Sequence, residues 1–140
     1  MPAGNAVAAW SLGRLAALTG ESRYAQAAER TVALFYPQMR DYPAGFAGMA
    51  IALSEQLVPP NLLILRGEGA ELEHWRDEFA REYLPDAAVL ALPYSMRDLP
   101  AALDKPRRPE PVNGWLCRGV MCLEPSSDIT YLKTACKEKQ

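Results

Sequence analysis

The chain has 140 residues, of which 49% are apolar and 23% are charged, so it can bury a core as one ordinary folded domain. Its net charge is −2 and it contains no long run of basic residues, so it lacks the electrostatic signature of a nucleic-acid binder. No uncharged stretch approaches the roughly 20 residues that span a bilayer, and no secretory signal is visible. We therefore expect neither a membrane span nor export.

Residues 1–60 are rich in alanine and leucine and predict an all-helical segment. We expect Asn5 to cap the first helix and Gly20 to end it, while Ser22 starts the second helix and Pro37 lies near its end. The loop between these two helices is short, so they should form an antiparallel hairpin. The apolar periodicity places the three helices at 6–17, 23–36 and 44–57.

Residues 61–140 predict a small α/β segment with strands at 62–66, 87–92 and 113–117 and helices at 70–84 and 128–137. The first two strands and the helix between them form a βαβ unit, so these strands should be parallel. The first of the two helices has an apolar face made of Leu72, Trp75, Phe79 and Tyr83. A proline-rich surface loop follows the second strand, and Ser127 or Asp128 can cap the last helix.

The predicted fold class is therefore α+β. The N-terminal helical hairpin region, 1–60, should pack beside a small three-stranded sheet that contains the βαβ unit, in 61–140, and the two should form one domain.

Cysteine and histidine usage limits the chemistry to Cys117, Cys122, Cys136 and the single His74. One histidine excludes a histidine-rich zinc site, and the C-x4-C spacing of Cys117 and Cys122 lacks the C-x2-C knuckle of many zinc sites. We expect no metal and no other cofactor. An odd number of thiols leaves one unpaired, which favours a reducing compartment, so we expect a cytoplasmic protein.

Four stretches together carry a family resemblance: 2–8 (PAGNAVA), 15–24 (LAALTGESRY), 83–85 (YLP) and 115–125 (WLCRGVMCLEP). They resemble the C-terminal end of the thioredoxin-domain-containing family that includes spermatogenesis-associated protein 20 and its bacterial relatives. That family has a P-S-G-N-S-like helix start, an L-x-x-L-T-G-x-x-x-Y hairpin, a Y-x-P exit and a Y-V-C-x-x-x-x-C-x-x-P ending. The resemblance spans nearly all of the chain.

The resemblance implies the tail of a six-hairpin (α/α) barrel, related in shape to sugar epimerases and glycosidases. Family members carry an N-terminal thioredoxin-like domain with a redox motif, which this chain lacks. The chain also departs from the pattern, because Ala3 and Ala6 replace serines at the helix start and Trp115-Leu116 replaces tyrosine and valine. These departures weaken the transfer of a polar site at the helix start.

Asn5 is a candidate sugar-cleft residue, because the loop-to-helix junctions of a resembling barrel can face its mouth. Helix capping is the simpler interpretation, since asparagine is among the best N-cap residues.

Cys117 and Cys122 are a candidate redox pair if a turn at Gly119 brings their sulfur atoms together. On one extended strand they would lie ~16 Å apart, far beyond the ~5.5 Å between Cα atoms that a disulfide needs. Packing as small apolar residues is the alternative that we favour. Arg118 could lower the pKa of Cys117, although one neighbouring cation is thin support.

The turn at 65–69 (LRGEG) resembles a fragment of a phosphate-binding loop, but Glu68 and Glu71 argue against an anion there, so we interpret its glycines as turn residues. We interpret His74 as a solvated surface residue. No carboxylate pair predicts a sugar-active site, since the carboxylates of the helical segment are scattered, at Glu21, Glu29, Asp41 and Glu55.

Three functions remain open from the sequence. The first is the non-catalytic C-terminal portion of a six-hairpin, carbohydrate-related protein of unknown substrate. The second is a partner-binding or self-assembly module, whose partner is the remainder of the same protein or a second copy that associates through Trp10, Phe35 or Phe46. The third is a thiol redox protein that uses Cys117 and Cys122. We expect no nucleic-acid and no membrane partner, and no catalysis by the isolated chain.

Overall fold

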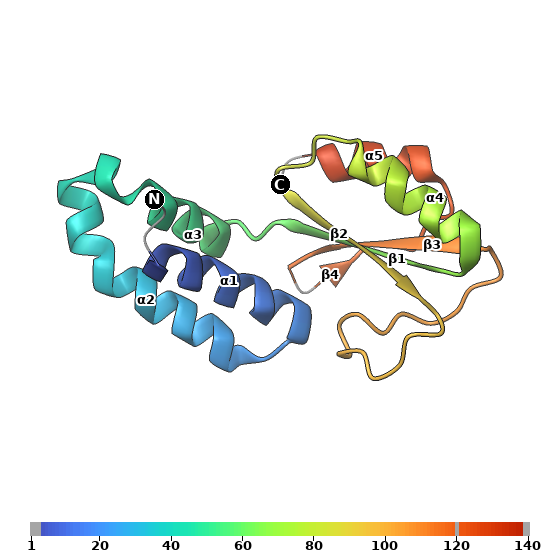
Figure 1. The fold of residues 1–140 in the computed structure, drawn as a ribbon, viewed down its shortest axis with the longest axis horizontal. Coiled ribbons are helices and arrows are strands. Elements are labelled where there is room, and N and C mark those ends of the chain that lie inside the picture. Colours follow the sequence, from blue (N-terminus) through green and yellow to red (C-terminus); the bar gives the residue numbers. More distant parts are fainter. Residues whose placement is uncertain (1–3, 120, 139–140) are drawn as a thin grey trace. The chain divides into compact units, whose positions relative to one another are not determined.

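A computed structural model describes residues 4–119 and 121–138 and divides the chain into two compact units, 1–59 and 60–140. The first unit is helical and the second combines helices with a sheet, so the fold class is α+β, as the sequence predicts. Figure 1 shows the helical unit in blue to green and the sheet unit in green to red. The joining of the two units into one domain stays a prediction.

The helical unit contains α1 (Gly4–Thr19), α2 (Ser22–Asp41), the short 3-10 helix η1 (Pro43–Phe46) and α3 (Ala47–Leu57). Helix α1 packs against both α2 and α3. Gly20 has a φ of 74° and donates a backbone hydrogen bond of 2.9 Å to Ala16, so the predicted glycine cap ends α1. Helix α2 begins at Ser22, as predicted.

Two helix boundaries differ from the prediction. Asn5 is the second residue of α1, so the helix begins before the expected cap. Helix α2 continues through Pro37 to Asp41. Proline removes one backbone hydrogen bond, but the helical turn beyond it buries Met39 in the core, and this packing offsets the loss. Residues 2 and 3 of the resembling helix start lie outside the described residues.

The core of the helical unit consists of small and flexible side chains: Ala6, Ala9, Ala28, Val32, Met39, Met49 and Ala52. Phe35 and Phe46 are partly buried against this core, with ring centroids 6.3 Å apart. Arg14 in α1 donates two hydrogen bonds to Glu55 in α3, at 2.7 and 2.6 Å. The pair links the first helix to the third.

The sheet unit contains β1 (Asn61–Gly67), β2 (Ala87–Pro93), β3 (Val112–Arg118) and β4 (Met121–Cys122), in the order β2-β1-β3-β4. Strands β1 and β2 are parallel and joined by α4 (Gly69–Ala80), which confirms the predicted βαβ unit. Strand β3 pairs antiparallel with β1 on its other side. The sheet has four strands instead of three, because the chain turns back after β3 and pairs as β4 instead of leaving the sheet.

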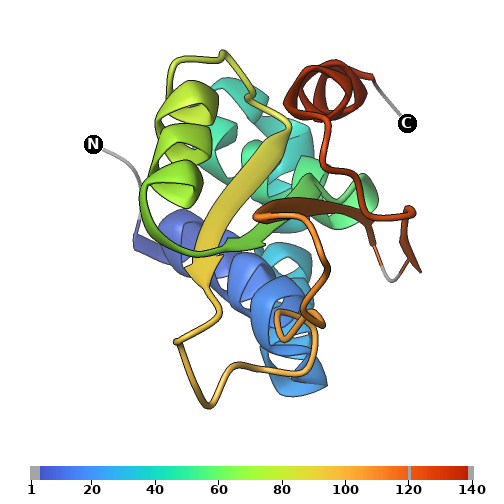
Figure 2. The same cartoon turned by 90° about the vertical axis from the view of Figure 1, so that its right-hand side faces the viewer.

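Helices α4 and α5 (Ile129–Lys137) cover one face of the sheet, as Figure 1 and Figure 2 show. Leu72, Trp75 and Phe79 of α4 are buried in this core, as the helical period predicts. Tyr83 is 85% exposed and the prediction that it shares this face is wrong. The helix ends at Ala80, three residues before Tyr83, so the helical period no longer holds there.

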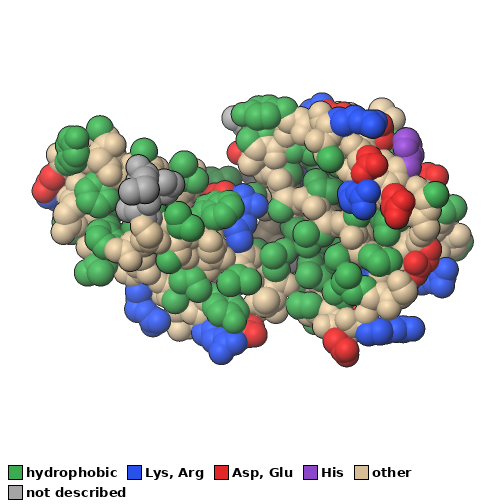
Figure 3. Space-filling view, viewed as in Figure 1, with side chains coloured by type: hydrophobic (Ala, Val, Ile, Leu, Met, Phe, Trp, Pro, Cys, Tyr) green, Lys and Arg blue, Asp and Glu red, His purple; other side chains and the backbone are tan. Residues whose placement is uncertain are grey.

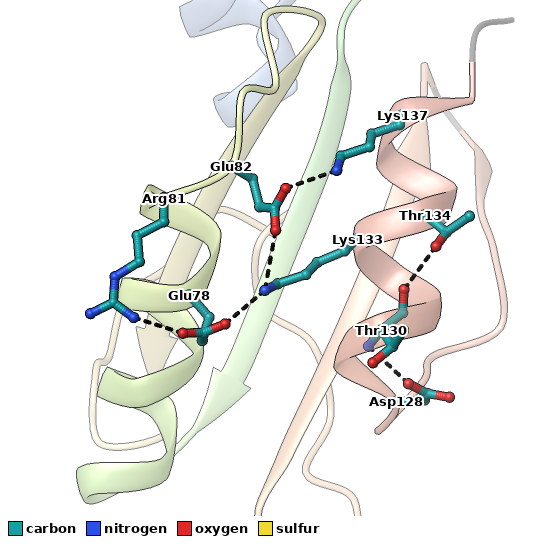
Figure 4. Close-up of polar contacts among 8 residues, drawn as sticks. All are labelled: Glu78, Arg81, Glu82, Asp128, Thr130, Lys133, Thr134 and Lys137. Atoms are coloured by element: carbon teal, nitrogen blue, oxygen red, sulfur yellow. Dashed lines mark hydrogen bonds and ion pairs between the residues drawn. The ribbon is translucent and has the colours of Figure 1, made fainter.

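A ladder of ion pairs joins α4 and the turn that follows it to α5, as Figure 4 shows. Lys133 Nζ contacts Glu78 at 2.8 Å and Glu82 at 3.3 Å, and Lys137 Nζ contacts Glu82 at 2.8 Å. Asp128 is the N-cap of α5 and accepts hydrogen bonds from the backbone of Thr130 and Tyr131, as the sequence predicts. The cap and the ladder add to the core contacts of Leu132, Ala135 and Cys136, which pack α5 against the sheet and α4.

Candidate functional site

The cysteine pair lies in the β3–β4 hairpin. Cys117 lies directly opposite Cys122, and their sulfur atoms form a disulfide bond. Gly119, with a φ of 59°, lies in the tight turn between the strands, where glycine adopts the left-handed conformation without strain. The favoured expectation of two separate apolar side chains is wrong, because the cysteines lie on two paired strands and not on one extended strand.

The two bonded cysteine residues differ in their exposure to solvent. Cys117 is 5% exposed, whereas Cys122 is exposed. Lys105 extends from the proline-rich loop and places its Nζ 3.4 Å from Cys122 Sγ. A cation beside a sulfur atom stabilises its thiolate, so Lys105 favours the reduced form of Cys122. An attacking thiolate would reach Cys122 first, and Cys117 would be the leaving group.

Arg118 does not act on Cys117 in the way the sequence suggests. Alternate residues of a strand point to opposite faces, and the Arg118 side chain donates a hydrogen bond of 3.1 Å to the carbonyl of Ala135 in α5. It also pairs with Glu138 at 3.8 Å. Its charge therefore acts on the α5 side of the sheet.

Cys136 is the free thiol of the described residues, and it lies on the buried face of α5, in the core of the sheet unit. Burial raises the pKa of Cys136 to about 11, and the charge of Arg118 only partly opposes this effect. The thiol is therefore neutral at physiological pH and does not act as a nucleophile.

Asn5 is exposed and lies within the first turn of α1, in the helical unit. The cysteines lie in the sheet unit. The structure thus assigns the candidate sugar-cleft residue and the candidate redox residues to different units. The sugar-cleft role of Asn5 stays a prediction.

The four carboxylates of the helical unit are not gathered into one acid–base pair. Glu21 pairs with Arg23, Asp41 pairs with Arg40, and Glu29 is exposed. Burial opposes ionisation of Glu55, but hydrogen bonds from Arg14 and Trp10 together with the charge of Arg14 outweigh it, so the pKa of this carboxyl lies below its usual value. A general acid for sugar chemistry needs the opposite shift.

Lys105 is the residue of this site that sequence reasoning missed. It lies 17 positions before Cys122, in a loop without periodicity, so no local pattern connects the two. The sequence shows only that Lys105 lies in a charged, proline-rich segment. That composition is typical of any surface loop and does not indicate a contact with Cys122.

Comparison with protein-family models, with curated proteins and with solved structures found no match. Within residues 4–119 and 121–138, no group of three or more potential metal ligands occurs. None of the helices in this part of the chain is long and apolar enough to cross a membrane. We therefore define the candidate site from the chemistry of the disulfide hairpin and Lys105 alone.

Proposed function

We propose that the chain is the non-catalytic C-terminal portion of a six-hairpin, carbohydrate-related protein of unknown substrate. The observation that carries the proposal is the all-round apolar character of α1 and α3. Arg14 is the single charged residue of α1 and Glu55 is the single charged residue of α3, and they pair with each other. Neither helix therefore has the charged outer face of a surface helix.

The apolar surface of these two helices is extensive for a unit of this size. Its large exposed side chains include Val7, Trp10, Leu15, Ile51 and Leu57, which are between 39% and 73% exposed. Figure 3 shows hydrophobic side chains spread over the face of the helical unit that is turned to the viewer. Helices that are apolar on every side are normally buried between other helices.

Further helical hairpins of a barrel are the occupant that fits this surface. Each of the two helices offers apolar residues on faces that point away from the small core of the unit, as a hairpin in the middle of a ring of hairpins does. The resemblance to the six-hairpin family favours the same occupant. The chain then completes a barrel and contributes no reacting group, because its carboxylates are dispersed and one of the four pairs with an arginine on a neighbouring helix.

Sedimentation velocity and binding of a hydrophobic dye test the proposal. We expect the 140-residue chain to bind the dye and to associate weakly, without a fixed mass, as its concentration rises. Ile51→Lys should reduce both effects, whereas Tyr83→Lys, at an exposed apolar position of the sheet unit, should not. A strict monomer that binds no dye would contradict the proposal.

The same measurement separates the self-assembly alternative, in which the partner is a second copy of the chain. That alternative predicts a dimer of fixed mass, because a closed interface uses the same patch on both copies. Trp10 is exposed and can join such a patch, whereas Phe35 and Phe46 are partly buried against the core of their own unit.

Catalysis is tested directly with the purified chain on aldoses, N-acylhexosamines and disaccharides. We expect no turnover, because acid–base work on a sugar needs a positioned proton donor and acceptor in an enclosed cleft. Turnover that disappeared in Glu55→Gln would overturn the non-catalytic assignment.

The Cys117–Cys122 disulfide favours a second candidate function, thiol–disulfide exchange. A client thiolate attacks Cys122 Sγ, the sulfur–sulfur bond breaks, and Cys117 leaves as a thiolate that takes up a proton. The second thiol of the client then attacks the mixed disulfide, and Cys122 leaves as a thiolate beside Lys105. Two electrons pass from the client dithiol to the hairpin, and of the two protons that the client loses, one is taken up by Cys117 and the other goes to solvent.

We also propose a cytoplasmic location. It makes the second candidate function, thiol–disulfide exchange, easier to test. Disulfides in the cytosol are usually transient and either catalytic or redox-sensing. The pair should therefore be reduced by glutathione near the cytosolic potential, and a dithiol peptide should be oxidised by the disulfide form. A hairpin that stays oxidised in excess glutathione would leave a structural role for the bond and contradict the exchange function.

A further inference from the structure

A buried arginine lies on the face of the sheet opposite α4 and α5, and two of its guanidinium nitrogens have no hydrogen-bond partner among the described residues. Arg66 is 3% exposed, and its Nε and Nη1 atoms make no hydrogen bond to the described residues. Leu63 and Leu65 point into the core beneath α4 and α5, so Arg66 points to the opposite face. Burying guanidinium N–H donors without hydrogen-bond acceptors is costly, because the donors lose their hydration without a hydrogen bond in return.

The nearest acidic group does not satisfy this charge. Asp104 Oδ1 lies 4.0 Å from Arg66 Nη2, which is too far for a hydrogen bond, and the Asp104 side chain is 68% exposed. The carboxylate therefore contributes a weak attraction across solvent and leaves the guanidinium donors available.

A second guanidinium lies near the same tyrosine as Arg66. The Arg66 and Arg107 guanidinium carbons lie 5.0 and 5.1 Å from the centre of the Tyr94 ring. The Tyr94 hydroxyl is buried and also makes no hydrogen bond to the described residues. Two guanidinium groups thus lie near one tyrosine ring, and among the described residues no hydrogen-bond acceptor meets Arg66 Nε, Arg66 Nη1 or the Tyr94 hydroxyl.

The position in the fold suits a ligand. Arg66 is near the carboxyl end of β1, and Tyr94 follows the last residue of β2, which pairs with Gly67. Ligands of open α/β sheets bind outside the carboxyl ends of parallel strands. Tyr94, Asp104 and Arg107 all belong to the loop that joins β2 to β3, in yellow to orange in Figure 1.

We propose that Arg66, Tyr94 and Arg107 form a binding site for a small oxyanion, a phosphate or carboxylate group on a soluble ligand. Guanidinium groups bind both kinds of oxyanion through paired N–H donors, and the tyrosine hydroxyl supplies a further donor. The anion displaces Asp104 from its loose contact with Arg66 and satisfies the buried donors. This site is separate from the disulfide and does not depend on either proposed function.

Thermal unfolding with inorganic phosphate or acetate, against potassium chloride at the same ionic strength, tests the site. A ligand of the folded state raises the unfolding temperature. We expect phosphate, acetate or both to raise it in the wild-type chain, and the anion with the larger shift identifies the ligand class. No shift beyond that of chloride overturns the proposal.

Two neighbouring arginines supply a matched pair of variants. Arg107 and Arg108 are both exposed, but Arg107 is the one placed over the Tyr94 ring. Arg107→Gln should weaken the apparent anion affinity by about tenfold, as expected when a charged donor is lost, whereas Arg108→Gln should keep the wild-type response. Equal responses of the two variants also overturn the proposal.

Arg66→Met separates binding from a purely structural role. Without added anion, we expect the variant to unfold at the same temperature as the wild type or a higher one, because a poorly paired buried charge has been removed. It should lose the response to phosphate and acetate. A variant that unfolds earlier and still responds to the anion overturns the proposal, and if it does not fold, the comparison of the Arg107 and Arg108 variants decides.

Discussion

Cys117 faces Cys122 across a two-strand hairpin, and the bond between their sulfur atoms leaves Cys136 as the free thiol among the described residues. The pairing arises because the strands on either side of Gly119 are in antiparallel register. Three cysteines that are equivalent in the sequence thus differ in the folded chain, one buried and bonded, one exposed and bonded, and one buried and free.

A thiol titration should resolve these three states. In the folded, oxidised chain we expect no rapidly reacting thiol, because Cys136 is buried and its pKa is raised to about 11. Unfolding without reductant should expose one thiol, and unfolding after reduction should expose three. Cys136→Ala should lower each count in the unfolded chain by one. Three thiols in the unfolded, unreduced wild type would show that the disulfide does not form.

Lys105→Gln should make the disulfide harder to reduce. The lysine stabilises the Cys122 thiolate of the reduced form, so its removal shifts the equilibrium toward the oxidised form. The lysine lies at the surface, so we expect a change of up to about fivefold in the equilibrium constant with glutathione, decreasing as salt is added. Arg108→Gln changes the charge of the same loop without touching the sulfur and is the control. An equal shift in both variants would indicate a general charge effect.

Glu55→Gln should destabilise the helical unit at neutral pH. The variant replaces the charged partner of Arg14, and we expect a loss of about 1 kcal/mol or less, because both side chains are about one-quarter exposed. Urea unfolding followed by circular dichroism measures it. Glu29→Gln, at an exposed position of the same unit, should leave the stability unchanged.

The loss from Glu55→Gln should depend on pH in one direction. The pKa of Glu55 is lowered in the folded chain, so its contribution is present above the unfolded pKa of about 4.3 and disappears as the pH falls through the folded pKa. The difference in free energy of unfolding between wild type and variant should therefore shrink toward zero in acid. A difference that grew as the pH fell would contradict this coupling.

Gly114→Ala should destabilise the sheet unit by about 1–3 kcal/mol, the usual cost of overpacking a core. An added Cβ would lie 3.2 Å from Leu65 and would overlap with a methyl group of Leu132, both fully buried. Gly13→Ala in α1 is the opposite case, because no described atom lies within 4 Å of its added Cβ and alanine favours the helix. Chemical denaturation should show a loss for the first and a gain of up to about 1 kcal/mol for the second.

Local patterns in the sequence determined most of the elements. The apolar period predicts α1, α2 and α5, Gly20 predicts the end of the first helix, and Asp128 predicts the cap of the last. The βαβ unit also follows from sequence, since two apolar runs separated by a helix can pair in parallel. Each of these patterns can be recognised in a short segment of the sequence, so it predicts its element without knowledge of the fold.

The tertiary structure alone decided the sites. Cys117 meets Cys122 because β4 turns back on β3, Lys105 meets Cys122 across a loop, and Arg66 lies near Tyr94 because β1 pairs with β2. Each contact depends on strand register or loop path, which the free energy of the whole unit sets and no local pattern records. The same reason explains why α2 continues past Pro37, since the packing of Met39 against other helices outweighs a local signal to stop.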